Sequence, residues 1–313
     1  MEPLVRHFAS AGPLDLRLTL AVHRRGSRDP TLRFSADGSA WRATRTPDGP
    51  ATLRLVRQGE TIRAQAWGPG AGWAIEQAPE LAGTLDGAAG FGAVVAGHPL
   101  LRSLHGRFPG IRIGRTHRVL EALVPAIIEQ KVTGDEARSA FVALVRRHGE
   151  PAPGPWDDAS AGRPAPLRVP PAPGTLAGLP GYAYHPLGLE RRRADAIRFA
   201  AAHASRAEES ADLPLPDAYA RLRAFPLVGA WTAAEVGLRA LGDPDVVSIG
   251  DFHLCHAVCQ ALAGEPRGTD ERMLELLAPF AGHRARVVRL IEVAGIHAPR
   301  RGPRFAPRSI ADI

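Results

Sequence analysis

The sequence predicts an α+β protein in which a small N-terminal antiparallel β-sheet domain is followed by an all-α domain. Before about residue 95, apolar residues alternate with polar or small ones, which is the period of a half-buried strand. After residue 116 they recur every three or four positions, which is the period of a helix. The length of 313 residues suits one large domain or two ordinary ones. We therefore expect a sheet domain over residues 1–95, a helical domain over 96–298 and a basic tail over 299–313.

The sheet domain is predicted from alternation and turn residues. Residues 14–22 alternate leucine or valine with other residues, so we expect a strand there. Two hairpins follow, each with a glycine in its turn. Their expected strands are residues 32–34, 41–43, 53–55 and 62–64. We expect the arginines of these strands to lie on the solvent-facing side of the sheet.

The helical domain is predicted from apolar stripes and end signals. A stripe from Leu120 to Ile128 marks the first helix, and Thr133 with Glu136 forms a capping box for the next. Residues 150–181 are rich in proline and weakly periodic, so we expect a loop or linker insertion. Further helices are expected over residues 189–203, 217–224, 231–241, 252–263, 270–277 and 284–294.

Composition narrows the class of protein. Its formal net charge of +7 and pI near 10.5 favour a polyanionic partner. No apolar run approaches the length of a membrane span, and the first residues lack a secretory signal, so we expect a cytoplasmic, nucleoid-associated protein. The two cysteines are too few for a disulfide scaffold or for an iron–sulfur cluster. Lys131 is the only lysine in the chain.

The segment from residue 222 to residue 254 carries the strongest chemical pattern. A helix ends, a tight turn rich in proline and glycine follows, and a new helix starts near Trp231. Such a turn directs backbone N–H groups and the positive end of a helix dipole at one point, which suits a phosphate. About twenty residues later, Asp251 opens another helix after an apolar segment.

At these residues the sequence resembles the helix–hairpin–helix DNA glycosylase superfamily, and within it the bacterial 3-methyladenine DNA glycosylase II type. Residues 225–233 are similar to the hairpin of that branch, and Asp251 falls where its catalytic aspartate is expected. Residues 108–112 and 126–133 are similar to its loop and wedge segment, and residues 187–194 to its middle helix. The resemblance covers residues 98–295 and implies a helix–hairpin–helix glycosylase domain behind the sheet domain.

The resemblance implies an enzyme of base-excision repair that flips a damaged nucleotide out of double-stranded DNA and hydrolyses its N-glycosidic bond. The substrates implied are alkylated purines such as 3-methyladenine and 7-methylguanine. Asp251 would be the catalytic carboxylate, and Gln130 and Lys131 would form the region that enters the space left by the flipped nucleotide. The DNA-binding hairpin would be Val228, Gly229, Ala230, Trp231 and Thr232.

Trp231 occupies the hairpin position where glycosylase-lyases of this superfamily carry a lysine that forms a Schiff base. The resemblance therefore implies a monofunctional enzyme that leaves an abasic site. It also implies a monomer without an iron–sulfur cluster, and a monovalent cation on main-chain carbonyls of the hairpin. Leu227 stands where that hairpin usually has its first glycine, so this turn must form without glycine's freedom.

The base pocket departs from the pattern of the family. Glu235 replaces an aromatic residue, and Ile291 lies near the position of an expected tryptophan. His253, two residues past Asp251, is expected either near the site or, equally, on a helix surface. A carboxylate could attract a cationic base by charge, where the family uses aromatic rings. Glu235 on a solvent-facing helix surface is an equal alternative.

Several alternatives stay open. Other lesions, such as deaminated or oxidised bases, are one; a DNA-structure-binding or damage-binding protein without turnover is another. Asp251 could only cap its helix, alone or in a capping box with Ser248, and Lys131 could be an ordinary solvated charge. Cys255, His256 and Cys259 lie within one helical turn, but no second ligand pair accompanies them, so we expect no metal.

Overall fold

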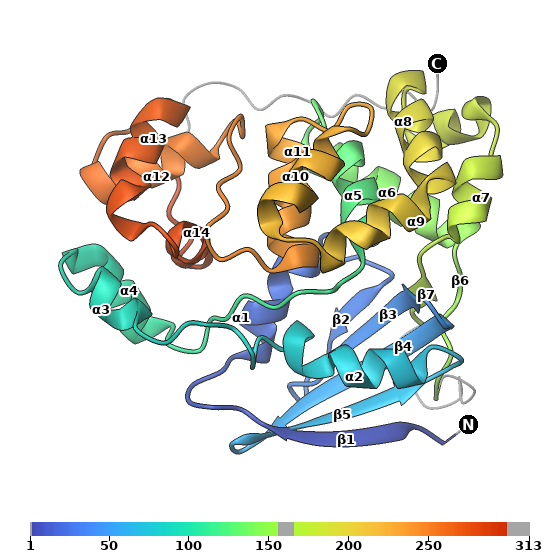
Figure 1. The fold of residues 1–313 in the computed structure, drawn as a ribbon, viewed down its shortest axis with the longest axis horizontal. Coiled ribbons are helices and arrows are strands. Elements are labelled where there is room, and N and C mark those ends of the chain that lie inside the picture. The colour runs from blue at the N-terminus through green and yellow to red at the C-terminus, as the bar shows by residue number, and fades with distance from the viewer. Residues whose placement is uncertain (1, 156–165, 299–313) are drawn as a thin grey trace.

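The computed structural model describes residues 2–155 and 166–298, so the basic tail predicted over residues 299–313 lies outside the described residues. A sheet with one long and one short helix beside it forms the lower part of the molecule in Figure 1, and most of the other helices lie above or to the left of it. This is the α+β arrangement predicted from the sequence. No helix in the described ranges is long and apolar enough to cross a membrane.

The sheet has five antiparallel strands in the order β1-β5-β4-β3-β2. The strands are β1 (Leu4–Ala9), β2 (Leu32–Phe34), β3 (Ala40–Thr46), β4 (Gly49–Gln58) and β5 (Thr61–Trp67). The two predicted hairpins are confirmed as β2–β3 and β4–β5. Helix α2 (Ala71–Leu81) packs its buried alanines and leucine against the sheet and closes this core.

The prediction of a strand over residues 14–22 is wrong. The segment forms helix α1 (Leu16–Leu20) and a 3-10 turn, η1 (Ala21–His23). The side chain of Asp15 caps the helix by accepting a hydrogen bond of 2.9 Å from the Leu18 amide. Leu16 and Leu20 are both buried, and two residues four positions apart satisfy a helical period as well as a strand period.

The upper part contains the helices that the periodicity predicts, with ends shifted by a few residues. They are α5 (Val119–Ile128), α6 (Gly134–His148), α8 (Arg191–Ala202), α10 (Leu215–Arg223), α11 (Ala230–Val236), α12 (Leu254–Ala263), α13 (Asp270–Leu277) and α14 (Arg284–Val293). A π turn, η5 (Gly237–Leu241), extends α11. The capping box of Thr133 and Glu136 is confirmed, because each side chain bonds the other's backbone amide.

Several further elements were not predicted. They are α3 (Phe91–Val95), α4 (Pro99–Arg107), α7 (Pro173–Gly178), α9 (Ala204–Glu208) and the 3-10 turns η3 (Gly181–Leu187), η4 (Glu209–Asp212) and η6 (Ala278–Phe280). The proline-rich segment is more ordered than a linker in its described part. Its strands β6 (Glu150–Pro151) and β7 (Arg168–Val169) pair with each other, and Leu167 and Val169 pack on Ala43 of the sheet.

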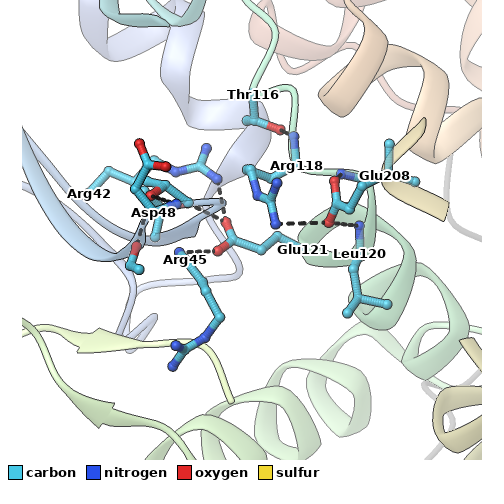
Figure 2. A network of polar contacts seen from close by, with 12 residues as sticks. Arg42, Arg45, Asp48, Thr116, Arg118, Leu120, Glu121 and Glu208 are labelled. Carbon is cyan, nitrogen blue, oxygen red and sulfur yellow. Dashed lines mark hydrogen bonds and ion pairs between the residues drawn. The ribbon is translucent and has the colours of Figure 1, made fainter. Parts of the chain in front are cut away.

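Charged side chains join β3 to the start of α5, and we call this group the sheet–helix interface (Figure 2). Glu121 accepts hydrogen bonds from Arg42 at 2.6 Å, from the Thr44 hydroxyl at 2.8 Å and from the Arg45 amide at 2.6 Å. The prediction that the arginines of the sheet face solvent is therefore wrong for Arg42, whose side chain is 13% exposed. A guanidinium next to a carboxylate of the other layer is stable in that position.

Two apolar clusters form the upper part. One includes buried residues of α5, α6, α8, α10 and α11, and the other includes those of α3, α4, α12, α13 and α14. In Figure 1 the second group stands to the left of the first. The chain passes from one group to the other between Leu241 and Leu254, and this crossing segment carries Asp251.

Candidate active site

The hairpin, residues 225–232, joins α10 to α11 by a tight turn. Its first turn is closed by a hydrogen bond of 3.2 Å from the Val228 amide to the Phe225 carbonyl. Leu227 has a φ of +62°, in the left-handed region that normally requires glycine, as expected from the sequence. Gly229 then caps α11, and both Gly229 and Ala230 are exposed. The exposed turn therefore presents its backbone to solvent, where a phosphate can reach it.

The residues predicted to enter the DNA lie beside this hairpin. Gln130 donates from Nε2 to the Leu227 carbonyl at 2.9 Å and to the Thr232 hydroxyl at 2.8 Å. Lys131 follows with a φ of +56° and an exposed side chain. The structure thus brings together two segments that are about a hundred residues apart in the sequence.

Asp251 faces the hairpin from the crossing segment. Its Oδ2 accepts a hydrogen bond of 3.1 Å from the indole N–H of Trp231. Its Oδ1 accepts bonds of 2.9 Å from the amides of His253 and Leu254, so Asp251 also caps the start of α12. The capping and site hypotheses are therefore compatible: one oxygen serves the helix and the other faces the hairpin.

The turn before Asp251 is held from two sides. The Asp251 amide donates to the Ser248 carbonyl at 3.3 Å, and the Gly250 amide donates to the Asp270 carboxylate at 2.8 Å. Gly250 has a φ of +87°, which a residue with a side chain rarely adopts. These contacts fix the direction of the Asp251 carboxylate before any ligand binds.

Glu235 lies one helical turn after Trp231, and its carboxylate contacts the η5 turn and the crossing segment. One carboxylate oxygen pairs with Arg239 at 2.5 Å, and the other accepts a bond of 2.7 Å from the Ser248 hydroxyl. Burial alone would raise the pKa of Glu235, but Arg239, Ser248 and Arg25 outweigh it and lower the pKa below 4.5. The carboxylate is therefore ionised, and its charge is already balanced inside the protein.

The three suggested pocket residues lie in different surroundings. Ile291 is fully buried in the core of the α12–α14 group, whereas His253 is exposed. The ring of His253 stands edge to face on Phe252, with centroids 4.9 Å apart. Phe252 is 78% exposed although it follows Asp251 directly, and the sequence analysis did not single it out. The signal in the sequence that could have identified Phe252 is an aromatic residue at a position outside the apolar stripe of α12.

The cysteine-rich turn does not form a metal site in the part of the chain that the structure describes. No group of three or more histidine, cysteine, aspartate or glutamate side chains there could hold a metal ion. Nδ1 of His256 lies 3.5 Å from the Cys255 sulfur and accepts a bond from the Gly268 amide. Burial raises the pKa of the Cys255 and Cys259 thiols, so both stay protonated near neutral pH.

The resemblance implies a monovalent cation on the main-chain carbonyls of the hairpin. Such an ion needs several carbonyl oxygens free to converge on it. Here the Phe225 carbonyl accepts from the Val228 amide, and the Leu227 carbonyl accepts from Gln130. Each of these carbonyl oxygens keeps a second lone pair, so the cation at the hairpin stays a prediction.

No family model matches the chain. A curated Mycobacterium tuberculosis protein, the probable bifunctional transcriptional activator/DNA repair enzyme AlkA, is 33% identical over 161 residues. The match covers 50% of this chain and 30% of the relative, so the chain spans less than a third of that protein's length.

Solved structures share the fold over most of the chain. A 3-methyladenine DNA-glycosylase from Archaeoglobus fulgidus matches with a TM-score of 0.76 and 21% identity, covering 91% of this chain and 97% of that one. An 8-oxoguanine glycosylase/lyase from Clostridium acetobutylicum matches with a TM-score of 0.68 and 12% identity, covering 93% and 96%. The chain thus has the same fold as these solved DNA glycosylases, and half of its sequence is similar to part of an AlkA protein, in agreement with the resemblance read from the sequence.

Proposed function

We propose that this protein is a monofunctional DNA glycosylase that hydrolyses the N-glycosidic bond of alkylated purines in duplex DNA. The observation that carries the proposal is the position of Asp251. Its carboxylate is fixed by two backbone amides and faces the DNA-binding hairpin through Trp231, at 3.1 Å. In addition, the relative from Mycobacterium tuberculosis is named a DNA repair enzyme, and the neighbour from Archaeoglobus fulgidus a 3-methyladenine glycosylase.

The chemistry follows from the carboxylate. Breaking the N-glycosidic bond develops positive charge on the sugar, and a fixed carboxylate beside the sugar stabilises that charge or activates water. An alkylated purine is already cationic and leaves easily, so the site needs no strong general acid. Trp231 offers no amine for a Schiff base, and the only lysine belongs to another loop. Hydrolysis, rather than a lyase reaction, is therefore the activity proposed.

DNA would bind across the exposed hairpin. The turn of Val228, Gly229 and Ala230 would hold a backbone phosphate, while Gln130 and Lys131 lie beside it, next to the flipped nucleotide. The net charge of +7 favours the approach of DNA and makes binding depend on salt. We propose that the protein acts as a monomer on nucleoid DNA, and light scattering of the protein–DNA complex tests that state.

The test is release of free bases from methylated duplex DNA. Wild-type protein should release 3-methyladenine or 7-methylguanine, with strand breaks only after alkali. Trapping of a protein–DNA adduct by borohydride would contradict the monofunctional assignment. Absence of release, with no preference for DNA that carries an abasic-site analogue, would indicate a DNA-structure-binding protein without turnover.

A second substrate class is favoured by the surroundings of Glu235. Its charge is balanced by Arg239, and Ile291 is buried, so neither supplies an aromatic surface for a cationic base. A neighbour of the same fold acts on 8-oxoguanine. Duplexes with a single hypoxanthine or 8-oxoguanine should therefore be tested in parallel. If either base is released faster than alkylated purines, that base is the substrate and the alkylated purines are not.

A further inference from the structure

The side-chain amide nitrogen of Gln130 donates both of its hydrogen bonds to the hairpin. An amide NH₂ group has two donors, and Gln130 directs its Nε2 at two acceptors, the Leu227 carbonyl and the Thr232 hydroxyl. These acceptors stand on either side of the turn that would hold a phosphate. The side chain therefore spans the turn and has no N–H left for a nucleotide.

The segment around Gln130, which we call the gap loop (residues 129–133), is fixed by its neighbours. Glu129 pairs with Arg25 at 2.6 Å, and the carbonyl of Ile128 accepts a bond of 2.7 Å from the buried Arg193. Gln130 thus follows one contact to the sheet part and one to α8, and its own side chain contacts the hairpin. A loop held at these points has little freedom to rearrange.

Two residues in this region have left-handed backbones without being glycine. They are Leu227, with a φ of +62°, and Lys131, with a φ of +56°. This conformation is disfavoured for residues with a Cβ and persists where surrounding contacts hold it. Gln130 precedes Lys131 in the chain and bonds the carbonyl of Leu227, so it contacts both positions.

Lys131 differs from Gln130 in having no partner. Its side chain is exposed, and among the described residues its ammonium forms no hydrogen bond or ion pair. A lysine can fill an apolar space with its four-carbon stem while its ammonium reaches a phosphate. Of the two neighbouring side chains, only that of Lys131 is free to move into DNA.

We propose that Gln130 is a positioning residue that ties the gap loop to the hairpin, and that Lys131 alone enters the space left by the flipped nucleotide. This inference rests on the proposed glycosylase function. It assigns different effects to the two residues. Gln130 supports the hairpin, which touches DNA whether or not a nucleotide is flipped, whereas Lys131 acts only on the flipped state.

The test compares binding to two duplexes of one sequence, one undamaged and one with a tetrahydrofuran abasic-site analogue. Gln130→Glu keeps the shape and removes both donors, so binding to both duplexes should weaken by about fivefold to tenfold. Lys131→Ala should weaken binding to the analogue duplex far more than to the undamaged one. Lys131→Met, which keeps most of the stem without the charge, should retain part of the preference for the analogue.

Two controls separate positioning from a general loss of structure. Gln130→Met removes the donors without placing a carboxylate beside the Leu227 carbonyl, and it should reproduce the Gln130→Glu effect in a protein that still unfolds cooperatively well above the assay temperature. Adding Leu227→Gly should restore part of the binding, because glycine adopts the left-handed turn without support. Loss of binding to the analogue duplex alone in both Gln130 variants would show that Gln130 itself enters the gap and would overturn the proposal.

Failure of the glycosylase function gives a different pattern. In that case the wild-type protein would bind both duplexes equally. The Gln130 variants would still weaken binding to undamaged DNA if the tie to the hairpin holds. A wild type without preference, combined with Gln130 variants that bind undamaged DNA normally, would reject both the function and the tie.

Discussion

The site at the hairpin and the sheet–helix interface both place a carboxylate at the N-terminus of a helix. Glu208 caps α5 by accepting bonds from the Val119 amide at 2.8 Å and the Leu120 amide at 3.1 Å, and Arg118 lies 3.1 Å away (Figure 2). Asp251 caps α12 in the same way through Oδ1. Its Oδ2, however, has only an indole N–H for a partner among the described residues, and no guanidinium.

The two capping carboxylates, Glu208 and Asp251, differ in whether a neighbouring cation balances their negative charge. Burial raises the pKa of Glu208, and Arg118 and the two amides lower it in part, so this carboxylate is fully engaged in structure. Within residues 2–155 and 166–298, Asp251 forms no ion pair, and its Oδ2 faces the hairpin. A capping carboxylate is therefore structural where a cation neutralises it, and it is available for chemistry where none does. Variants at the two places should separate rate from stability.

The largest effect is expected at Asp251. Asp251→Asn should slow base release by about 10³-fold, or about 4 kcal/mol, because the amide cannot stabilise positive charge on the sugar. Folding should be kept, since asparagine is also a good helix cap. Single-turnover release from methylated duplex DNA measures the rate. Asp15→Asn, the same change at the cap of α1, is the matched control and should leave the rate unaltered; a rate within tenfold of wild type for Asp251→Asn would exclude the proposed role.

At the sheet–helix interface, the effect should fall on stability. Glu121→Gln leaves Arg42 without its counterion and weakens the bonds to Thr44 and the Arg45 amide, so unfolding should become easier by about 3 kcal/mol. Urea unfolding followed by circular dichroism measures this change. The rate of base release well below the melting temperature should stay within about twofold of wild type. A large loss in the rate of base release without a loss of stability would show that the sheet–helix interface contributes to catalysis, which would contradict this prediction.

At Glu235, which bonds Arg239 and Ser248, the effect should fall on stability and depend on pH. Glu235→Gln should lower stability by about 2 kcal/mol, less than Glu121→Gln, because Arg239 keeps a bond to the Val22 carbonyl. The folded pKa of Glu235 lies below 4.5, so its stabilisation is present above that pH and is lost as the pH falls through the folded pKa. The difference between wild type and variant should therefore be constant between about pH 6 and 8 and shrink below about pH 4.5. A difference that grows in acid would contradict the direction of the pKa shift.

The smallest effect is expected at Trp231. Trp231→Phe keeps most of the ring and removes the N–H that orients Asp251, so base release should slow by about tenfold, close to one hydrogen bond. The matched control is Trp41→Phe in the sheet, which loses an indole bond of 3.0 Å to the Ser39 hydroxyl. The control should alter the melting temperature slightly and the rate not at all. Equal rates for both variants would show that the Trp231 bond does not position Asp251.

Local sequence pattern was sufficient to predict those helices and strands whose buried residues follow a single period. The capping box at Thr133 and the bounds of α13 were predicted because a helix end depends on residues within one turn. It failed over residues 14–22, where the same leucines satisfy two periods and the Asp15 cap decided the outcome. Local pattern also did not predict that Arg42 is largely buried at the sheet–helix interface, because the sequence of a strand does not specify which layer covers each of its faces.

The sequence by itself determined the α+β division, the hairpin with Leu227 in the place of a glycine, tryptophan instead of lysine at position 231, and Asp251 as the candidate carboxylate. The division depends on hydrophobic periodicity, and the other three depend on the resemblance of the sequence to a known family. Only the tertiary structure decided that Gln130 bonds residues 97 and 102 positions away, that Glu235 is balanced by Arg239 and that Ile291 lies in the core. The physical reason is that hydrogen bonds and ion pairs depend on distances of about 3 Å, which only the packing of distant helices sets.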